Sequence, residues 1–303
     1  MTRSVTQPPG LGFSQDFLNR LETLRLRARR RFLGKRKGMH VSPRRGTSLE
    51  FADYRSYAAG DDPRTVDWGL YARTDRLYVK VFQEEEDLFG YLFVDASASM
   101  AHPDGDAKYR AATALALALC YVILSSGDSV RLHRLQQGRN DATPFYFGRR
   151  RMLEAREFFE REPPAGALDL KRSLAPHLAS LRRPGKGILI SDLLMPIKEL
   201  QAGVNLLRAA KLDVLVLQTL GRLELAPAAS GIERFVDAES GRESDLRFDE
   251  RGRATYLQNL TRHRRDLRNF CHRAGVQYAF YDTSSDLEDF VLTELPALGL
   301  LRE

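Results

Sequence analysis

Apolar residues along the chain follow two spacings in turn, and these predict strands and helices that alternate. Tyr91 to Val94 is continuously apolar, which is typical of a strand covered on both faces. Residues 106–125 are apolar almost all round, which predicts a helix buried against that strand. Beyond them the pattern predicts strands at 129–135, 144–147, 187–191, 212–219 and 276–281, and helices at 150–160, 170–181, 197–209, 251–273 and 285–295.

This alternation indicates an α/β fold with a doubly wound, largely parallel sheet and right-handed crossovers. An N-terminal helical and small β extension precedes it. Leu21, Leu24, Ala28 and Phe32 recur at helical spacing within an expected helix over 14–32. A second expected helix, over 63–70, begins at Asp62-Pro63, an N-cap acceptor followed by proline, and a strand is expected at 77–81.

These boundaries divide the chain into three parts. Residues 1–46 are expected to form a basic N-terminal helix and loop, and residues 47–88 a small subdomain. Residues 89–303 are expected to form the α/β domain, with a surface excursion or hairpin at about 223–250.

Composition places the chain in a reducing compartment. Its two cysteines, Cys120 and Cys271, form neither a disulfide framework nor a thiolate zinc pattern. The start has no apolar stretch of signal-peptide length, and the longest apolar run, 111–124, is shorter than the about 20 residues of a spanning helix. We therefore expect a cytoplasmic protein without a transmembrane segment.

The net charge of +7 is concentrated in a basic run between Arg25 and Lys37. We interpret this run as the solvated face of the first amphipathic helix. Binding to nucleic acid or to an anionic membrane through this helix is the less favoured alternative, because no nucleic-acid-binding motif accompanies the charge. The acidic run 84–87 is interpreted as a solvated turn.

A candidate metal site follows the first buried strand. Asp95, Ser97 and Ser99 occupy every second position in VDASAS. In an extended chain the first and last would lie roughly 13 Å apart, too far to share an ion, so we expect the segment to curl. A carboxylate and two hydroxyls suit Mg²⁺ rather than zinc or copper. Alternatively, these side chains only cap helices and loops.

A second acidic strand end lies in ISDLL, where Asp192 follows an apolar run. Ligands of parallel sheets collect at the carboxyl ends of strands, so we expect Asp192 to join Asp95, Ser97 and Ser99 around one Mg²⁺. His102 lies nearby in the sequence and is interpreted as a bystander.

Two known patterns are similar to these segments. DASASM with the later ISD resembles the metal-ion-dependent adhesion site of von Willebrand factor A domains. Together with EFADYRSYAAGDDPRTVDW and YAR, it resembles the bacterial family catalogued as domain of unknown function fifty-eight, from about Gly46 onward. The resemblance implies that the two serines bind the metal directly. The two aspartates would bind it either directly or through a group that is itself bound to the metal. The usual threonine ligand is replaced by Ala167, which leaves Asp169 or water to fill its place.

The block that carries the family resemblance consists of Arg55, Tyr57, Gly60, Asp61, Asp62, Arg64, Asp67, Trp68 and Arg73. Arginine and aspartate at these spacings can form bidentate pairs. We expect such pairs to fix a compact subdomain with Trp68 as its anchor. A direct contact with a partner is the alternative.

We expect a non-enzymatic protein-interaction module whose metal leaves one coordination position open for a carboxylate of the partner. The family resemblance implies that this partner is a MoxR-type AAA+ ATPase, in chaperone-like assembly or maturation. The alternative is a metal-dependent hydrolase such as a phosphatase with Asp95 as nucleophile. A phosphoaspartyl enzyme of the haloacid dehalogenase type would carry a second aspartate at Ser97, and no Walker A loop occurs.

Overall fold

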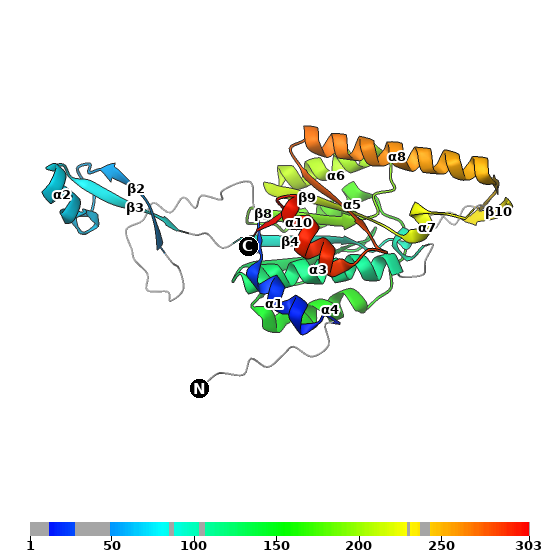
Figure 1. The fold of residues 1–303 in the computed structure, drawn as a ribbon, viewed down its shortest axis with the longest axis horizontal. Helices are drawn as coiled ribbons and strands as arrows, with labels where there is room; N and C mark the ends of the chain where they lie inside the picture. Colours follow the sequence, from blue (N-terminus) through cyan, green and yellow to red (C-terminus); the bar gives the residue numbers. More distant parts are fainter. Residues whose placement is uncertain are drawn as a thin grey trace. The chain divides into compact units, whose positions relative to one another are not determined.

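The computed structural model describes residues 12–27, 49–84, 88–102, 107–228, 231–236 and 243–302 (Figure 1). The chain divides into two compact units. The large unit consists of Met1–Arg31 and Leu88–Glu303, and the small unit of Phe32–Asp87. The basic run from residue 28 to residue 37 and the acidic residues 85–87 lie outside the described residues.

A central sheet organises the large unit. Its strand order is β12 (Gln277–Asp282), β9 (Leu212–Leu220), β8 (Gly185–Ser191), β4 (Phe89–Asp95), β5 (Ser129–Leu135) and β6 (Asp141–Ala142), with β7 (Tyr146–Phe147) also paired with β5. The first five strands are parallel, whereas β6 and β7 run antiparallel to β5. The predicted mixed α/β architecture with a largely parallel sheet is confirmed.

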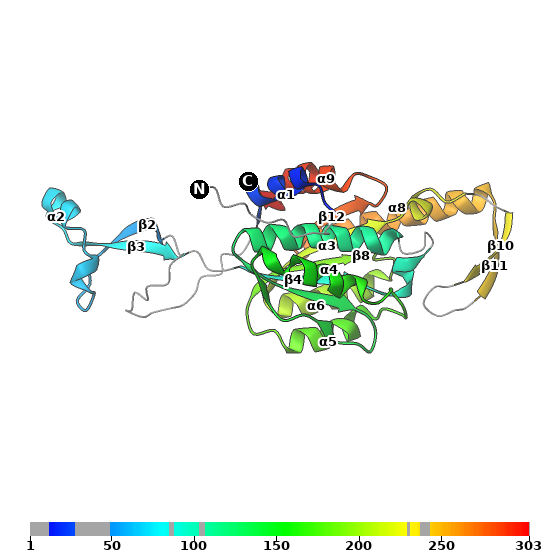
Figure 2. The same cartoon turned by 90° about the horizontal axis from the view of Figure 1, so that it is seen from below.

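Helices cover both faces of the sheet (Figures 1 and 2). One face carries α1 (Gln15–Thr23), α3 (Ala107–Ser125), α4 (Met152–Glu160) and the C-terminal helical stretch of α9 (Leu287–Asp289), η4 (Phe290–Glu294) and α10 (Leu295–Ala297). The other carries α5 (Leu170–Ala179), α6 (Ile197–Ala209) and α8 (Glu250–Arg273). A short 3₁₀ turn, η3 (Arg149–Arg151), precedes α4.

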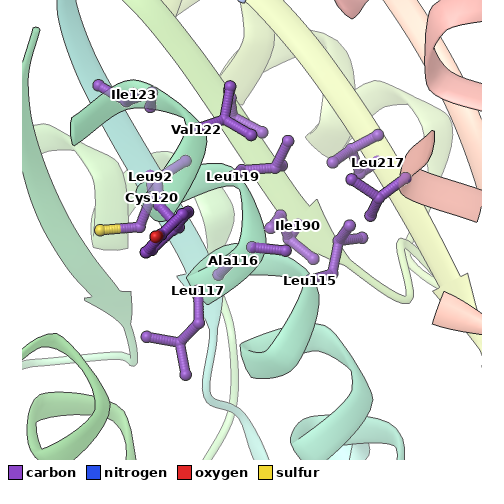
Figure 3. Packing of buried hydrophobic residues seen from close by; sticks show 14 of the residues in the cluster. Leu92, Leu115, Ala116, Leu117, Leu119, Cys120, Val122, Ile123, Ile190 and Leu217 are labelled. Carbon is purple, nitrogen blue, oxygen red and sulfur yellow. The ribbon is translucent and has the colours of Figure 1, made fainter. Parts of the chain in front are cut away.

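Helix α3 forms the centre of the first core, as the sequence predicts. Its Leu115 and Leu119 are fully buried and belong to one apolar cluster with Ile190 of β8 and Leu217 of β9 (Figure 3). By length and composition α3 is apolar enough to cross a membrane, but 78% of its apolar window is buried inside the protein. This burial is the pattern of a core helix.

Strand β4 is the point at which strand order reverses. The chain adds β5 on one side of β4 and later adds β8 on the other. In open parallel sheets such a switch point opens a crevice at the carboxyl ends of the strands. Asp95, the last residue of β4, lies at this position.

Helix α1 is shorter than the sequence predicts. Ser14 caps it, and it ends at Thr23, after which Leu24 is extended. Residues Arg25–Leu26 then form β1, which pairs antiparallel with β13 (Leu301–Arg302). The prediction of a helix through Phe32 is therefore wrong for residues 24–27, because tertiary pairing overrides the helical spacing, and residues 28–32 lie outside the described part.

The small unit is built on two antiparallel strands, β2 (Leu49–Ser56) and β3 (Tyr78–Glu84). A 3₁₀ turn, η1 (Pro63–Thr65), and a helix, α2 (Trp68–Thr74), connect them. The single helix predicted over 63–70 is interrupted because Val66 is extended and bridges to Val79. Asp62 caps η1 as predicted, and Asp67 caps α2.

The predicted excursion after β9 contains a short helix, α7 (Arg222–Leu225), and a hairpin. The hairpin strands are β10 (Gly231–Val236) and β11 (Glu243–Phe248), which pair antiparallel.

Candidate functional site

The site begins with the carboxylate of Asp95, which is fully buried at the end of β4. One oxygen, Oδ1, accepts hydrogen bonds from the Ser97 amide at 2.9 Å and the Ser97 hydroxyl at 2.7 Å. The other, Oδ2, accepts from the Ser191 hydroxyl at 2.6 Å. Asp95 therefore fixes the position of hydroxyls from two different strand ends.

The chain curls directly after Asp95. Ser97 is extended and precedes a 3₁₀ turn, η2 (Ala98–Ala101). This turn brings the Ser99 hydroxyl to 3.0 Å from the Ser97 hydroxyl. In a strand these alternate residues would hold their side-chain oxygens far apart. The turn instead places the oxygens of Asp95, Ser97 and Ser99 close together.

The neighbouring strand β8 ends with Ser191 and is followed by Asp192, both buried. The Asp192 backbone carbonyl accepts a hydrogen bond from the Gln218 amide group at 2.9 Å. Leu193 has a positive φ of 54°, a region that costs a non-glycine residue about 1–2 kcal/mol. Two hydrogen bonds hold this backbone in place. The Leu193 amide donates to the Ser191 hydroxyl, and the Leu193 carbonyl is bonded to His263. We call Asp95, Ser97, Ser99, Ser191 and Asp192 the rim site.

A buried lysine lies beside the rim site. Lys108, in the first turn of α3, donates hydrogen bonds to Asp192 Oδ2 at 2.8 Å and to Glu224 Oε1 at 2.5 Å. Glu224 also accepts from the Gly221 amide at 2.7 Å. Burial lowers the pKa of Lys108, but its two carboxylate partners outweigh this effect and raise the pKa. The lysine is therefore a permanent cation of the cluster.

The negative charge at the rim site exceeds this positive charge. The Lys108 ammonium pairs with the buried carboxylates of Asp192 and Glu224, and a third buried carboxylate, that of Asp95, belongs to the rim site. Burial raises the pKa of Asp95 to about 7, and the charge of Asp192 adds to this rise, whereas the hydrogen bonds from Ser191 and Ser97 oppose it. With all three carboxylates ionised, the cluster lacks two positive charges.

The donor set fits a divalent cation in charge and in chemistry. The Ser97 and Ser99 hydroxyls are hard oxygen donors placed side by side, as Mg²⁺ requires. They would hold the ion, with Asp95 orienting Ser97 and Asp192 balancing charge. In the described part of the chain no three His, Cys, Asp or Glu side chains form a metal-binding group, so direct ligation here depends on the serines and on water.

The loop expected to provide a further ligand contacts the rim site through its backbone. The Ala98 amide donates to the Gly166 carbonyl at 2.8 Å, and the Ala165 amide donates to the Ala96 carbonyl at 2.9 Å. Ala167 offers no side-chain oxygen. Asp169 accepts from the Arg172 amide at 2.9 Å and so caps α5, which engages it away from a ligand role. His102 is exposed just after η2.

The residues of the family-like block belong to the small unit, whereas those of the rim site belong to the large unit. Arg55 and Asp61 form the expected bidentate pair, with N–O distances of 2.6 and 2.7 Å. Trp68 differs from the expectation: it is 60% exposed and contacts Tyr71 edge-on, so it does not anchor this unit. Arg64 and Arg73 are exposed, as is Gly60, whereas Tyr57 and Asp62 are half-buried.

Three members of the cluster are not among the residues that the sequence reasoning selected: Ser191, Lys108 and Glu224. Ser191 could be found by aligning the ends of β4 and β8, because neighbouring parallel strands end at one level. Lys108 has a weaker signal, a lone cation in an apolar helix. Glu224 lies in the four-residue helix α7 and carries no signal of its own.

The chain is similar in sequence to one protein family and to uncharacterized mycobacterial proteins. The sequence profile of a family described as "Protein of unknown function DUF58" matches residues 53–266. The uncharacterized protein Rv1480 of Mycobacterium tuberculosis (strain ATCC 25618 / H37Rv) is 29% identical over 280 residues, which cover 89% of this chain and 86% of that protein. The uncharacterized protein Mb1516 of Mycobacterium bovis matches to the same extent.

Solved structures similar to this chain are more distant in sequence. The conserved hypothetical protein BatB from Bacteroides thetaiotaomicron aligns with a TM-score of 0.39 and 16% identity, over 70% of this chain and 98% of that one. An aerotolerance-related membrane protein from Bacteroides fragilis, with multiple mutations to serines, aligns with the same TM-score and identity over 69% and 97%.

Proposed function

The chain belongs to the DUF58 family, and we propose that it serves as a non-enzymatic protein-interaction module that docks a partner at the rim site through a bound Mg²⁺. The observation that carries this proposal is the convergence of Asp95, Ser97 and Ser99 with Ser191 and Asp192 at the switch point of the sheet. Such a position is where open α/β sheets bind their ligands.

The proposed site is a reduced form of the adhesion site of von Willebrand factor A domains. The curled serine pair and the two strand-end aspartates support this assignment. The missing ligand at Ala167 leaves more of the ion's coordination to water and to a partner. A carboxylate from the partner suits an open position on Mg²⁺, since hard cations prefer oxygen anions.

The surroundings of the rim site also suit protein contact. Leu194, two residues after Asp192, is 43% exposed, and Leu223, next to Glu224, is 46% exposed. Lys108 connects the two carboxylates that neighbour these leucines. Exposed apolar side chains beside the site would give a partner an apolar contact area, which protein interfaces have at their core. Following the family resemblance, the partner in this proposal is a cytoplasmic MoxR-type AAA+ ATPase.

Asp95 is poorly placed for the alternative role of a phosphatase nucleophile. Its side chain is fully buried, and both oxygens accept hydrogen bonds from hydroxyl groups. A nucleophile must present an oxygen to the substrate. This arrangement favours a positioning role for Asp95.

The test is capture of a MoxR-type ATPase from the same organism by the purified chain, with Mg²⁺ or with EDTA. We expect capture in Mg²⁺, and its loss in EDTA and for Ser99→Ala. Ser180→Ala, a substitution at the C-cap of α5, is the matched control and should capture normally. Equal capture by all three proteins, with and without EDTA, would overturn the proposal.

A further inference from the structure

The two helical layers of the large unit carry opposite charge. Helices α5, α6 and α8 contain eleven arginines and lysines and three carboxylates. On the other face, α1, α3, α4 and the stretch 287–297 contain four arginines and lysines and eight carboxylates. The positive charge is thus concentrated on one side of the sheet.

Nine of these cations are exposed, and we call them the basic face: Lys171, Arg172, Lys198, Arg208, Arg251, Arg262, Arg265, Arg268 and Arg273. Two of the nine have an ion pair, Arg172 with Asp169 at 3.4 Å and Arg265 with Asp266 at 3.5 Å. Exposed pairs of this kind contribute little. The other seven form no ion pair with any residue that the structure describes, so their charge is available to an external anion.

The basic face lacks the side chains that recognise proteins or single-stranded nucleic acid. None of the large apolar residues exposed in the described ranges lies on α5, α6 or α8. Between the cations of α8 the exposed residues include Gln258, Asn259, Thr261 and Asn269. Protein interfaces combine arginines with aromatic anchors, and base stacking requires aromatic rings. No exposed phenylalanine, tyrosine or tryptophan lies on the described residues of these three helices.

The basic face is also extended. Helix α8 has 24 residues and so extends for about 36 Å. Its buried Leu267 and Phe270 belong to the apolar core on this side of the sheet, and the helix contacts α6 (Figure 1). A helix that reads duplex DNA must instead enter the major groove. The cations of the basic face belong to three helices rather than to a single recognition helix.

We propose that the basic face binds the anionic headgroup layer of a membrane by electrostatic adsorption, without insertion. A headgroup layer is an extended array of negative charges, which complements exposed cations, most of them unpaired, distributed over three helices. Adsorption without insertion follows from the absence of exposed apolar side chains on these helices, because insertion requires an apolar face. None of the nine cations of the basic face belongs to the rim site, so this inference does not depend on the proposed partner.

The experiment is co-sedimentation of the full chain with vesicles. One set contains phosphatidylglycerol in phosphatidylcholine and the other phosphatidylcholine alone, both at low ionic strength. Each arginine near an anionic surface contributes about fivefold in binding. We therefore expect R262Q/R265Q/R268Q to weaken binding to the anionic vesicles roughly a hundredfold. R20Q/R110Q/R150Q removes the same charge from exposed positions on the opposite side and should bind nearly as the unmodified chain does.

Each remaining outcome overturns the proposal. Equal binding to both vesicle types would show that headgroup charge is not recognised. Equal weakening by the two triple variants would show a response to net charge alone. Binding that persists in high salt would indicate insertion rather than adsorption, since screening removes surface attraction. Preference for duplex DNA over vesicles at equal phosphate concentration would assign the face to nucleic acid.

Discussion

The Lys108 ammonium lies 2.8 Å from the Asp192 carboxylate, and the two side chains are only 2% and 4% exposed. Glu224 contacts the same ammonium from the segment after β9. One lysine of α3 thereby joins the end of β8 to the start of α7. The rim site is consequently supported by a buried ionic connection.

Lys108→Met should destabilise the large unit by about 3–5 kcal/mol, because it leaves two buried carboxylates without their partner. Urea unfolding monitored by circular dichroism measures this loss. Lys171→Met, at an exposed lysine of α5, is the control and should change stability by less than about 0.5 kcal/mol. A small loss for Lys108→Met would mean that water compensates the carboxylates.

Asp95→Asn should separate metal binding from folding. The amide has nearly the shape of the carboxylate, and the hydroxyls of Ser97 and Ser191 can reorient toward it. We expect a melting temperature in EDTA within a few degrees of that of the unmodified chain, and loss of the rise on adding Mg²⁺. Asp169→Asn, at the α5 cap, should retain that rise. An equal Mg²⁺ response in the Asp95 variant would remove Asp95 from the site.

Stability should decrease as the pH is lowered below neutrality because of the buried pair His133 and His177, whose Nδ1 atoms lie 3.0 Å apart. Burial lowers the pKa of His177 to about 4, and the charge of Arg131 contributes, whereas Asp141 and a backbone bond at Arg134 oppose the change. Burial also lowers the pKa of His133. The unfolded chain therefore takes up protons first, from about pH 6.5 downward.

For His177 alone, the loss of unfolding free energy from pH 7 to pH 5 should be about 2 kcal/mol. It should level off below pH 4, where both states are protonated. Urea unfolding at the two pH values measures it. His177→Gln removes this titration and should have a smaller loss over the same interval; identical losses in the two proteins would show that His177 does not contribute.

Trp68→Ala should cost less than about 1 kcal/mol, because an exposed ring loses little burial on truncation. Val79→Ala is the comparison: Val79 is 5% exposed, and its truncation should destabilise the small unit by about 2 kcal/mol. Thermal unfolding of both variants tests the difference. A loss for Trp68→Ala as large as that for Val79→Ala would restore Trp68 as an anchor of this unit.

The fold was predictable where the signal is local. Continuous apolar runs identify β4, β8 and β9 because both faces of each strand are covered. The grouping of Asp95 with Asp192 follows from the rule that ligands collect at the carboxyl ends of parallel strands. Helix α1, in contrast, ends at Thr23 because Arg25 and Leu26 pair with residues near 301, a contact that helical spacing cannot reveal.

The contacts of Lys108 with Asp192 and Glu224 could not be predicted from local sequence patterns. Lys108 and Glu224 are 116 residues apart in the sequence. Their contact depends on how α3 and the segment after β9 arrive at one edge of the sheet. Sequence periodicity determines which face of a helix is buried, but not which distant charge meets it. The exposure of Trp68 has the same origin, because the fold of the small unit determines it.

The pairing of β1 with β13 joins the N-terminal and C-terminal segments of the large unit, and the small unit is inserted between them in the sequence. Residues 25–26 and 301–302 fasten to each other, and Phe17, Leu18 and Leu21 of α1 fill the core against α3. A fragment starting at residue 88 would lack α1, so the apolar surface of α3 would be exposed to solvent and the fragment would tend to aggregate. Replacing residues 28–87 with a short flexible linker, rather than cutting the chain there, is therefore the way to obtain the α/β unit by itself.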